Sequence, residues 1–397
     1  MTVKQYYQDA YMKTFQTSIQ DQRQDDSGWY VVLEETAFYP TGGGQPHDTG
    51  TLKDKRIINV EEVNGEIRHY IEEPFEDISG DVKGQIDWDR RFDHMQQHAG
   101  QHILSAAFAE ALLYETVSFH LGKEVLTIDL DVSDLTESEA LEAEALANRV
   151  IRESRYIETR WVTEAELSQY PLRKQPTVTD DIRLVMIPDF DYNGCGGTHP
   201  RSTSEVGAIK ILDWEKHKGH IRLQFVCGDR VLNQLHRKHG LLKELTVVLQ
   251  APEENMVPTV ERMVAKQKEQ EKALEGLKEV LLTYEAQGLL GEGTSQEGYT
   301  LIKKAYSDRS IQELQKIAQH IVAKREEAIV LLVVQNDHKL QLVAAKGSSP
   351  SANLREVAQK VFPLINGKGG GNKSFVQGGG EVVMSREELL ETLVNQL

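Results

Sequence analysis

Cysteine is scarce in this sequence of 397 residues, and long apolar runs are absent from it. Its two cysteines, Cys195 and Cys227, exclude a disulfide framework and favour a reducing compartment. No stretch approaches the ~18 consecutive apolar residues of a membrane span, and the first residues lack the apolar core of a signal peptide. We therefore expect a cytoplasmic protein that does not associate with membranes.

Basic residues are also in deficit, since 45 Lys and Arg stand against 62 Asp and Glu, for a net charge of −17. An acidic chain gains little from nonspecific contact with a polyanion, so binding to nucleic acid would need a local basic face. The composition, 39% hydrophobic and 27% charged, is otherwise that of an ordinary folded protein. At ~150 residues per domain the length predicts two or three domains.

The fold class that we expect is a multidomain α+β protein beginning with a β-barrel-like domain over residues 1–89. Short runs rich in β-branched and aromatic residues alternate there with turn signals such as Asn64-Gly65. The same stretch contains the glycine-rich motif TGGGQPHDTG at 41–50. We expect little helix before residue 90.

A helical pattern begins at Arg90 and opens a second domain, residues 90–235, which we expect to be α+β. Apolar side chains recur at helical spacing from Met95 to Leu112. The other expected elements are a strand at 125–132, a helix capped by Thr136 and Glu139, and strands at 207–213 and 220–227.

Residues 236–293 are expected to form a charged helical connector. Gln267 and Glu271 interrupt the apolar seam between Val260 and Tyr284, which favours a long solvated helix or a short helical hairpin over a sustained coiled coil. Residues 294–397 then predict a C-terminal α/β domain. Its expected elements are a strand at 299–303, a helix at 310–324, strands at 329–334 and 340–345, a helix near 351–361 and a glycine-rich loop at 365–380.

His98 and His102 lie four residues apart on the first expected helix, so both imidazoles share one face and are able to bind one metal ion. Taken alone, the pair is equally well explained as a polar helix face. The zinc-protease motif needs a glutamate directly after the first histidine, and Ala99 stands there. The sequence therefore excludes a peptidase of that type.

A second pair of metal-ligand types, Cys195 and His199, lies in the glycine-rich segment DFDYNGCGGTHP. Thiolate and imidazole both bind zinc, and the glycines permit a tight turn around a metal. We predict that one zinc ion (Zn²⁺) per chain is held by His98, His102, Cys195 and His199. Cys227 ends an alternating strand and is expected in the core.

These motifs resemble a known family. MQQHAGQHILSAAF and CGGTH are similar to the editing domains of alanyl-tRNA synthetase and, more distantly, of threonyl-tRNA synthetase. ETAFYPTGGGQPHDTG resembles the glycine-rich segment of the alanine branch, and GKGGGNKSFVQGGG the domain shared by that synthetase's tail and DHH-type phosphoesterases. The Asp-His-His motif of those phosphoesterases is missing. Because no class II synthetase core precedes the segments, the resemblance is to the long, free-standing alanyl-tRNA editing proteins.

The resemblance implies a zinc-dependent deacylase that acts in trans on tRNA(Ala) mischarged with serine, and on the glycine-mischarged form as well. Zinc would polarise the ester carbonyl or activate water, or hold the site together if four ligands fill its coordination shell. A site that hydrogen-bonds the serine hydroxyl would reject alanine. Candidates for that recognition are Thr36, Thr41, Gln101 and Ser118.

Contacts to tRNA and to a second copy of the chain are expected in the C-terminal half. A homodimer would form through the helical connector or the C-terminal domain. Two alternatives stay open, namely a non-catalytic tRNA-binding protein stabilised by zinc, and editing of another mischarged tRNA such as a substrate of the threonine system. The candidate tRNA contacts are Arg237, Lys238, Lys303, Lys304, Lys368 and Lys373.

Overall fold

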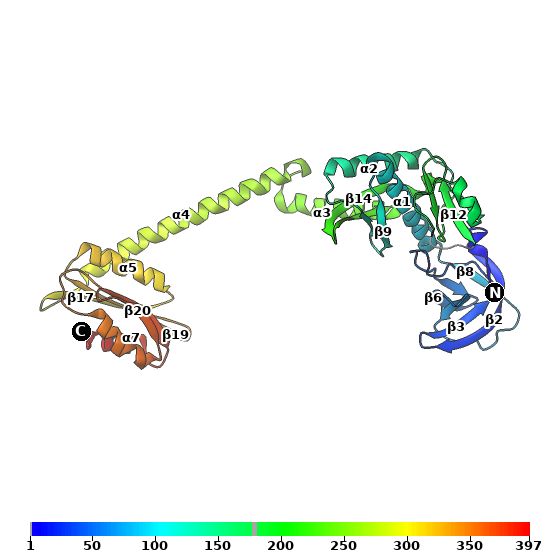
Figure 1. Cartoon of the computed structure of the whole chain (residues 1–397). Helices are drawn as coiled ribbons and strands as arrows, with labels where there is room; N and C mark the ends of the chain where they lie inside the picture. Colours follow the sequence, from blue (N-terminus) through cyan, green and yellow to red (C-terminus); the bar gives the residue numbers. More distant parts are fainter. Residues whose placement is uncertain (1, 177–180) are drawn as a thin grey trace. The chain divides into compact units, whose positions relative to one another are not determined.

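The computed structural model describes residues 2–176 and 181–397. It divides into two compact units, Met1–Leu245 and Thr246–Leu397, each of which is described by itself (Figure 1). Helices and strands occur in both units, which confirms the expected mixed α+β class. None of the helices in the described ranges combines the length and the apolar character that crossing a membrane requires.

Six strands of the N-terminal unit close into a barrel in the order β2-β3-β7-β6-β5-β8. Residues alternate between the interior and the surface, as in β8, where Val82 and Ile86 are buried and Lys83 is exposed. A bulge between Ile19 and Asp21 bends β2 and helps the sheet to close. The strands are β2 (Thr14–Asp25), β3 (Gly28–Leu33), β5 (Gly50–Leu52), β6 (Lys55–Val63), β7 (Glu66–Ile71) and β8 (Asp81–Ile86), beside the short pair β1 (Val3–Lys4) and β4 (Glu35–Thr36).

Helix α1 (Trp88–Leu112) follows the barrel and carries the predicted histidines. It begins two residues before the expected start at Arg90, because Asp87 takes the extended N-cap conformation and its carbonyl accepts the Arg91 backbone N–H at 3.1 Å. The Arg91 guanidinium is fully buried and donates through Nε to the Asp48 carboxylate of the barrel at 3.0 Å. This buried ion pair fixes the helix against the glycine-rich segment.

The rest of the N-terminal unit packs two helices on a four-stranded sheet of order β14-β15-β10-β9, beside a three-stranded sheet of order β11-β12-β13. The capping box of Thr136 and Glu139 is confirmed at the start of α2 (Glu137–Arg152). The three expected strands occur: the strand at 220–227 has the expected ends, and the ends of the other two are shifted by one to four residues. The strands are β9 (Thr116–Leu121), β10 (Leu126–Leu130), β11 (Glu158–Val162), β12 (Ile182–Ile187), β13 (Asp191–Gly194), β14 (Ile209–His217) and β15 (His220–Cys227).

Two long helices, α3 (Asp229–Leu249) and α4 (Met256–Gly291), occupy the expected connector. Helix α3 starts before residue 236, so no element boundary falls there. Helix α4 has 36 residues, more than the 29 expected from Thr259. At 1.5 Å per residue it is about 54 Å long. Apolar side chains of α4 such as Leu277 and Tyr284 are exposed.

The C-terminal unit has a six-stranded sheet of order β16-β17-β18-β19-β21-β20 with helices packed on it. The expected glycine-rich loop at 365–380 is wrong, because β20 and β21 pair as an antiparallel hairpin there. The glycines let these strands approach each other and a neighbouring ring, since a Cβ at Gly378 would lie 2.5 Å from Gly369 Cα and from the Phe362 ring. The elements are β16 (Thr294–Gln296), β17 (Tyr299–Ser307), α5 (Ile311–Lys324), β18 (Ala328–Asn336), β19 (Lys339–Lys346), α6 (Leu354–Val361), β20 (Lys368–Gly371), β21 (Phe375–Glu381) and α7 (Arg386–Val394).

Candidate metal centre and adjoining pocket

Helix α1 presents His98 and His102 one turn apart, with their ring centroids 5.3 Å apart. Both imidazoles are almost completely buried, as is most of this helix from His94 to Phe108. The helix is therefore a core element, and the polar face considered as an alternative for the pair is wrong. His94 is also buried, but it does not belong to the cluster that the other two histidines enter.

Strand β13 leads directly into the loop that carries Cys195 and His199. The Cys195 backbone N–H donates to Arg183 O at 2.9 Å, and the buried Arg183 guanidinium donates back to the carbonyls of Cys195 and Gly197 at 2.9 and 2.8 Å. A Cβ at Gly197 would lie 2.3 Å from the His98 ring. The loop can approach the helix this closely because that position is glycine.

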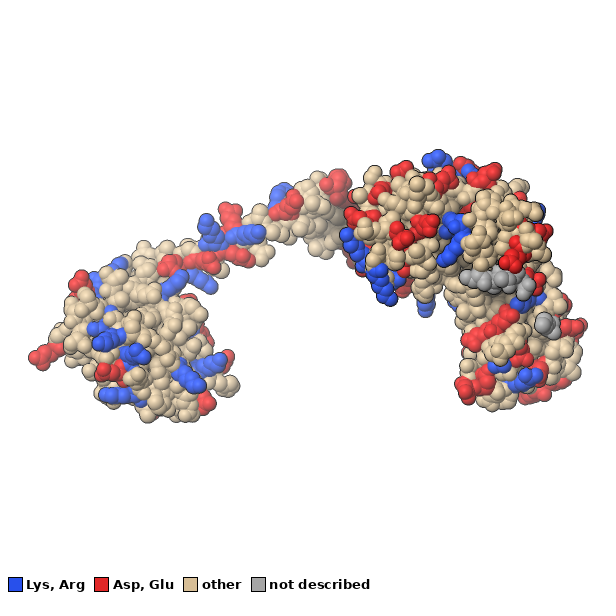
Figure 2. Space-filling model, in the orientation of Figure 1, with Lys and Arg blue, Asp and Glu red and all other residues tan. Residues whose placement is uncertain are grey.

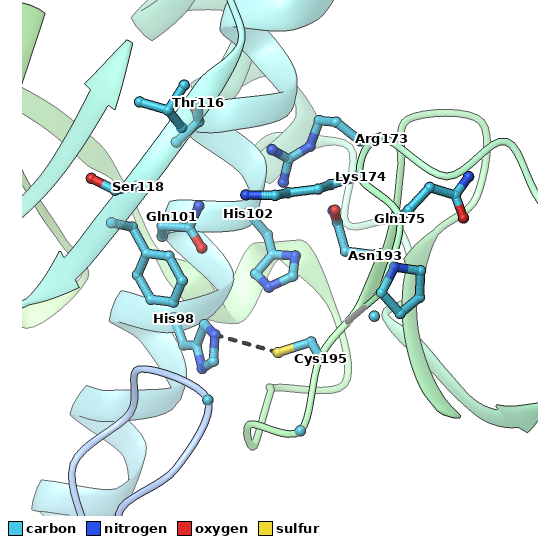
Figure 3. Close-up of a pocket in the computed structure, with 16 residues that line it drawn as sticks. His98, Gln101, His102, Thr116, Ser118, Arg173, Lys174, Gln175, Asn193 and Cys195 are labelled. Atoms are coloured by element: carbon cyan, nitrogen blue, oxygen red, sulfur yellow. Dashed lines mark hydrogen bonds between the residues drawn. The ribbon is translucent and has the colours of Figure 1, made fainter. Parts of the chain in front are cut away.

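The four predicted ligands meet at one point. Their candidate ligand atoms all lie within 4.8 Å of one another. Cys195 Sγ is 3.4 Å from His98 Nε2 (Figure 3) and 3.3 Å from His199 Nε2. Zinc bonds of ~2.3 Å to sulfur and ~2.0 Å to nitrogen place the ligands of a tetrahedral ion about 3.3–3.6 Å apart. The two sulfur–nitrogen distances agree with this spacing, and three imidazoles with one thiolate are a ligand set that fits zinc.

Two side chains fix the outward nitrogens of the ligand rings. His98 Nδ1 lies 3.1 Å from Gln45 Oε1, and His102 Nδ1 lies 3.0 Å from the Asp191 carboxylate. An amide oxygen and a carboxylate only accept here, so each ring carries its proton on Nδ1 and leaves Nε2 for a metal. Asp191 is 2% exposed, so solvent screens its interaction with His102 very little.

The surroundings also favour a thiolate at Cys195. Burial raises the pKa of this thiol, but the neighbouring His98 and His199 more than offset burial and hold that pKa well below its usual range. Burial lowers the pKa of His199 to about 3. For His102, burial is outweighed by the contacts with Asp191 and Cys195, which raise its pKa to about 9, so a metal would displace a proton from that ring. A thiolate and a neutral imidazole are the forms that bind zinc. Cys227, by contrast, is fully buried in the core as expected, and burial raises its pKa.

A cavity of about 330 Å³ opens beside the cluster (Figure 3). Two of the four predicted recognition residues, Gln101 and Ser118, line it. Gln101 donates from Nε2 to Ser105 Oγ at 2.9 Å, and the Ser118 hydroxyl donates to Asp129 Oδ2 at 2.6 Å. The lining residues are Gly43, His98, Gln101, His102, Thr116, Val117, Ser118, Phe119, Arg173, Lys174, Gln175, Pro176, Asn193, Gly194, Cys195 and Gly196.

The other two recognition candidates do not line this cavity. Thr36 is fully buried in the barrel, where its Oγ1 lies 2.8 Å from His69 Nε2. Thr41 is exposed, and its Oγ1 lies 3.1 Å from His47 Nδ1. The glycine-rich motif reaches the cavity through Gly43 instead.

Sequence reasoning missed several residues around the site. Gln45 lies inside the glycine-rich motif, and nothing in the sequence distinguishes it from the other residues there. Asp191 is the third residue of DFDYNGCGG, so its closeness to Cys195 was visible, but its bond to His102 depends on the fold. Arg173 and Lys174 carry no motif and enter the cavity wall only because their segment runs beside β13.

None of the six predicted tRNA contacts lines this cavity. Lys303 pairs with Glu391, and Lys304 lies 3.8 Å from Glu292. Lys368 begins strand β20, and Lys373 lies in the turn that follows it. Arg237 and Lys238 lie on helix α3. Their role in binding tRNA stays a prediction.

Three protein-family models match the chain. The model described as "Threonyl and Alanyl tRNA synthetase second additional domain" matches residues 182–224, which include the Cys195 loop. The model "tRNA synthetases class II (A)" matches residues 3–90, and the "DHHA1 domain" matches residues 299–397. Together these matches reach from the barrel to the C-terminal unit.

Relatives match over almost the full chain. An alanine–tRNA ligase of Pyrococcus abyssi is 33% identical over 99% of this chain, which spans 43% of that ligase. The alanyl-tRNA editing protein AlaX-L of Pyrococcus horikoshii is 30% identical over 100% of this chain and 98% of the relative. The alanyl-tRNA editing protein Aarsd1 of Mus musculus is 32% identical over 91% and 87%. The chain therefore belongs to the family of alanyl-tRNA editing proteins, as its motifs predicted.

Proposed function

We propose that this protein is a zinc-dependent deacylase that hydrolyses the ester bond of tRNA(Ala) mischarged with serine, and with glycine as well, in trans. The observation that carries the proposal is the cluster of His98, His102, Cys195 and His199 at the wall of an open cavity. The names of the AlaX-L and Aarsd1 relatives support action on alanyl-tRNA.

The bound metal would be held by side chains whose orientation is fixed by their hydrogen-bond partners in the protein. When bound, zinc supplies polarisation of the ester carbonyl or a water with a pKa near ~7, or it positions the terminal adenosine if the four side chains fill its shell. Gln45 and Asp191 hold the His98 and His102 rings in the orientation that ligation needs.

Selectivity for serine would come from polar groups in the cavity. The Gln101 amide donates to Ser105, and its carbonyl oxygen accepts no hydrogen bond from the part of the chain that the structure describes. That oxygen would accept a hydrogen bond from the hydroxyl of a seryl group. Alanine in the same position would enclose this oxygen without a hydrogen-bond partner, at a cost of ~1–3 kcal/mol.

We also propose a division of labour along the chain. Residues 1–89 contribute the barrel and the glycine-rich motif, 90–235 the zinc site, 236–293 the connector, and 294–397 a domain that helps to capture tRNA. The proposed tRNA contacts are the basic residues of α3 and of the C-terminal unit. The "DHHA1 domain" match over 299–397 supports a separate C-terminal module.

A homodimer through helix α4 is proposed on its exposed apolar side chains. Val260, Leu274 and Leu281 lie fourteen and then seven residues apart, on one heptad position that Gln267 interrupts, and they are 44, 54 and 66% exposed, as expected of a seam that a second helix covers. Light scattering of the full-length protein tests this. Leu274→Glu with Leu281→Glu should give a monomer, whereas Lys272→Glu on the same helix should not.

The function itself is tested by incubating the purified protein with seryl-, glycyl-, alanyl- and threonyl-tRNA and following loss of the ester. We expect rapid loss of serine from tRNA(Ala), slower loss of glycine and no loss of alanine. Preferred hydrolysis of a threonine-system substrate would replace the proposed substrate.

One structural feature favours a second candidate function. Four protein ligands complete the tetrahedral shell of zinc, which is typical of structural rather than catalytic sites. A zinc-stabilised protein that binds tRNA without hydrolysing it would fit that feature. It would bind all four charged tRNAs in the same assay and leave every ester intact.

A further inference from the structure

Among the residues that the structure describes, no acidic side chain lines the cavity beside the metal cluster, although about one residue in six of this chain is Asp or Glu. Its lining does include two basic neighbours, Arg173 and Lys174. On the faces visible in Figure 2, by contrast, basic and acidic side chains are interspersed. A cavity whose described lining carries cations and no carboxylate, in a protein of net charge −17, is suited to an anionic ligand.

The backbone fixes these two residues relative to the metal cluster. The Arg173 N–H donates to Tyr192 O at 3.0 Å, and Lys174 forms a parallel bridge with Asn193. Both partners belong to β13, the strand that leads into Cys195. Arg173 and Lys174 therefore lie along the edge of β13, the strand that positions the metal ligand Cys195.

The two cations differ in what they contact. Arg173 donates from Nε to the Asp191 carboxylate at 2.9 Å, and the other oxygen of that carboxylate faces His102 Nδ1. The charge of Arg173 is thus matched within the protein. Lys174 forms no ion pair with any residue in the described ranges, and Figure 3 shows its side chain extending over the cavity in the direction of Gln101.

We propose that Lys174 binds the phosphate on the 5′ side of the terminal adenosine of the tRNA, and that the pair of Arg173 and Asp191 positions Lys174. This inference rests on the proposed function. With the aminoacyl ester at the metal cluster, the nearest negative charge of the substrate is that phosphate, one nucleoside away. A long, exposed lysine at the open side of the cavity has the reach to meet it, and such contacts fix the register of a nucleic acid without reading its sequence.

The first test measures hydrolysis of seryl-tRNA(Ala) by the full-length protein carrying Lys174→Gln. We expect KM to rise about threefold to tenfold with kcat at saturation unchanged, because a charge-assisted contact made in both the bound and the transition state is lost. Lys174→Arg should restore KM. The matched control is Lys83→Gln, which removes the same charge from an exposed position of β8 and should leave KM unchanged.

The second test separates the phosphate from the rest of the substrate. The wild-type protein should hydrolyse the seryl ester of cytidylyl-adenosine with a lower KM than the seryl ester of adenosine, and Lys174→Gln should abolish that difference. If Lys174→Gln raises KM equally for both esters, Lys174 does not bind the phosphate and the inference is overturned.

Affinity for uncharged tRNA, measured by fluorescence anisotropy across a salt series, needs no hydrolysis. Lys174→Gln should reduce the slope of log Kd against log salt by about 0.7, the value for one phosphate contact on a single strand. If the wild-type protein hydrolyses no ester but Lys174→Gln still reduces the salt slope, the proposed function is overturned and the phosphate contact is supported. An active wild-type protein with an unchanged slope in the variant would overturn the contact and leave the function standing.

Discussion

The side-chain oxygen of Gln45 lies 3.1 Å from Nδ1 of His98 and 3.0 Å from the backbone nitrogen of Thr198. One amide of the glycine-rich segment therefore contacts both halves of the predicted metal site, the helix that carries His98 and the loop that carries His199. The Gln45 amide nitrogen also donates to the Thr198 hydroxyl at 2.8 Å. The barrel is in this way part of the metal site, although it supplies none of the four ligands.

Replacing Gln45 should weaken zinc binding without removing a ligand. In Gln45→Leu the His98 ring loses the acceptor that orients it, so we expect zinc affinity to fall by about 10-fold or more in competition with a chelator. Gln24→Leu, on an exposed position of the same barrel, is the control. Equal zinc affinity in Gln45→Leu and the wild type would show that Gln45 does not orient His98.

Two adjacent glycines of the Cys195 loop should respond differently to alanine. A Cβ at Gly197 would lie 2.3 Å from the His98 ring, whereas one at Gly196 would meet only the Tyr7 hydroxyl at 3.4 Å. Gly197→Ala should therefore displace the ring and lower the zinc content measured by elemental analysis. Gly196→Ala should keep about one zinc per chain, and full zinc content in Gly197→Ala would argue against the close approach.

Substitutions should separate the recognition candidates inside the cavity from Thr36 in the barrel. Gln101→Leu should slow hydrolysis of seryl-tRNA by ~1–3 kcal/mol in the activation free energy, with unchanged zinc content, because a buried polar partner is lost. Thr36→Val should instead lower the free energy of unfolding, because His69 loses its hydrogen bond. If Thr36→Val folds stably and fails to hydrolyse seryl-tRNA, Thr36 recognises the serine.

Much of the site was accessible from sequence because it depends on local spacing. A helix period puts His98 and His102 on one face, and the glycines around Cys195 indicate a loop that is able to approach a metal closely, as Gly197 approaches the His98 ring. The pairing of Gln45 with His98, and of Asp191 with His102, joins segments 53 and 89 residues apart. No local pattern predicts which distant polar group will face a given ring.

The fold shows the same contrast between local and distant information. The capping box of Thr136 and Glu139 predicted the start of α2, since both partners lie within one turn. The glycine-rich segment at 365–380 was expected to be a loop, because glycine is a poor strand former by itself. It forms a hairpin because Phe362 leaves room only for bare backbone there, a tertiary constraint.

Acid should weaken the fold beside the cavity through Asp129. The hydrogen bonds that Arg222 and Ser118 donate outweigh burial and lower the pKa of Asp129 from 3.8 to about 2. A carboxylate with a lowered pKa stabilises the fold above its unfolded pKa, and that contribution is lost as the pH falls from about 4 to about 2. Asp129→Asn should therefore be less stable than the wild type at pH 7, by roughly 1 kcal/mol after solvent screening.

Thermal unfolding at several pH values measures this contribution. The difference between Asp129→Asn and the wild type should shrink between pH 4 and pH 2. Asp134→Asn provides the control, because its pair with Lys216 is exposed and 3.7 Å long, and surface pairs contribute little. A difference that stays constant down to pH 2 would exclude Asp129 as its source.

The central claim is that the cluster of His98, His102, Cys195 and His199 holds the zinc that deacylation requires. The most direct measurement is the initial rate of serine release from seryl-tRNA(Ala) by the full-length protein as purified, after removal of the metal, and after zinc is restored. We predict that the purified protein releases serine, that removal of the metal abolishes this release, and that added zinc restores it. Alanyl-tRNA(Ala) should stay intact in all three preparations. An unchanged rate in protein shown by elemental analysis to contain no metal would contradict the account.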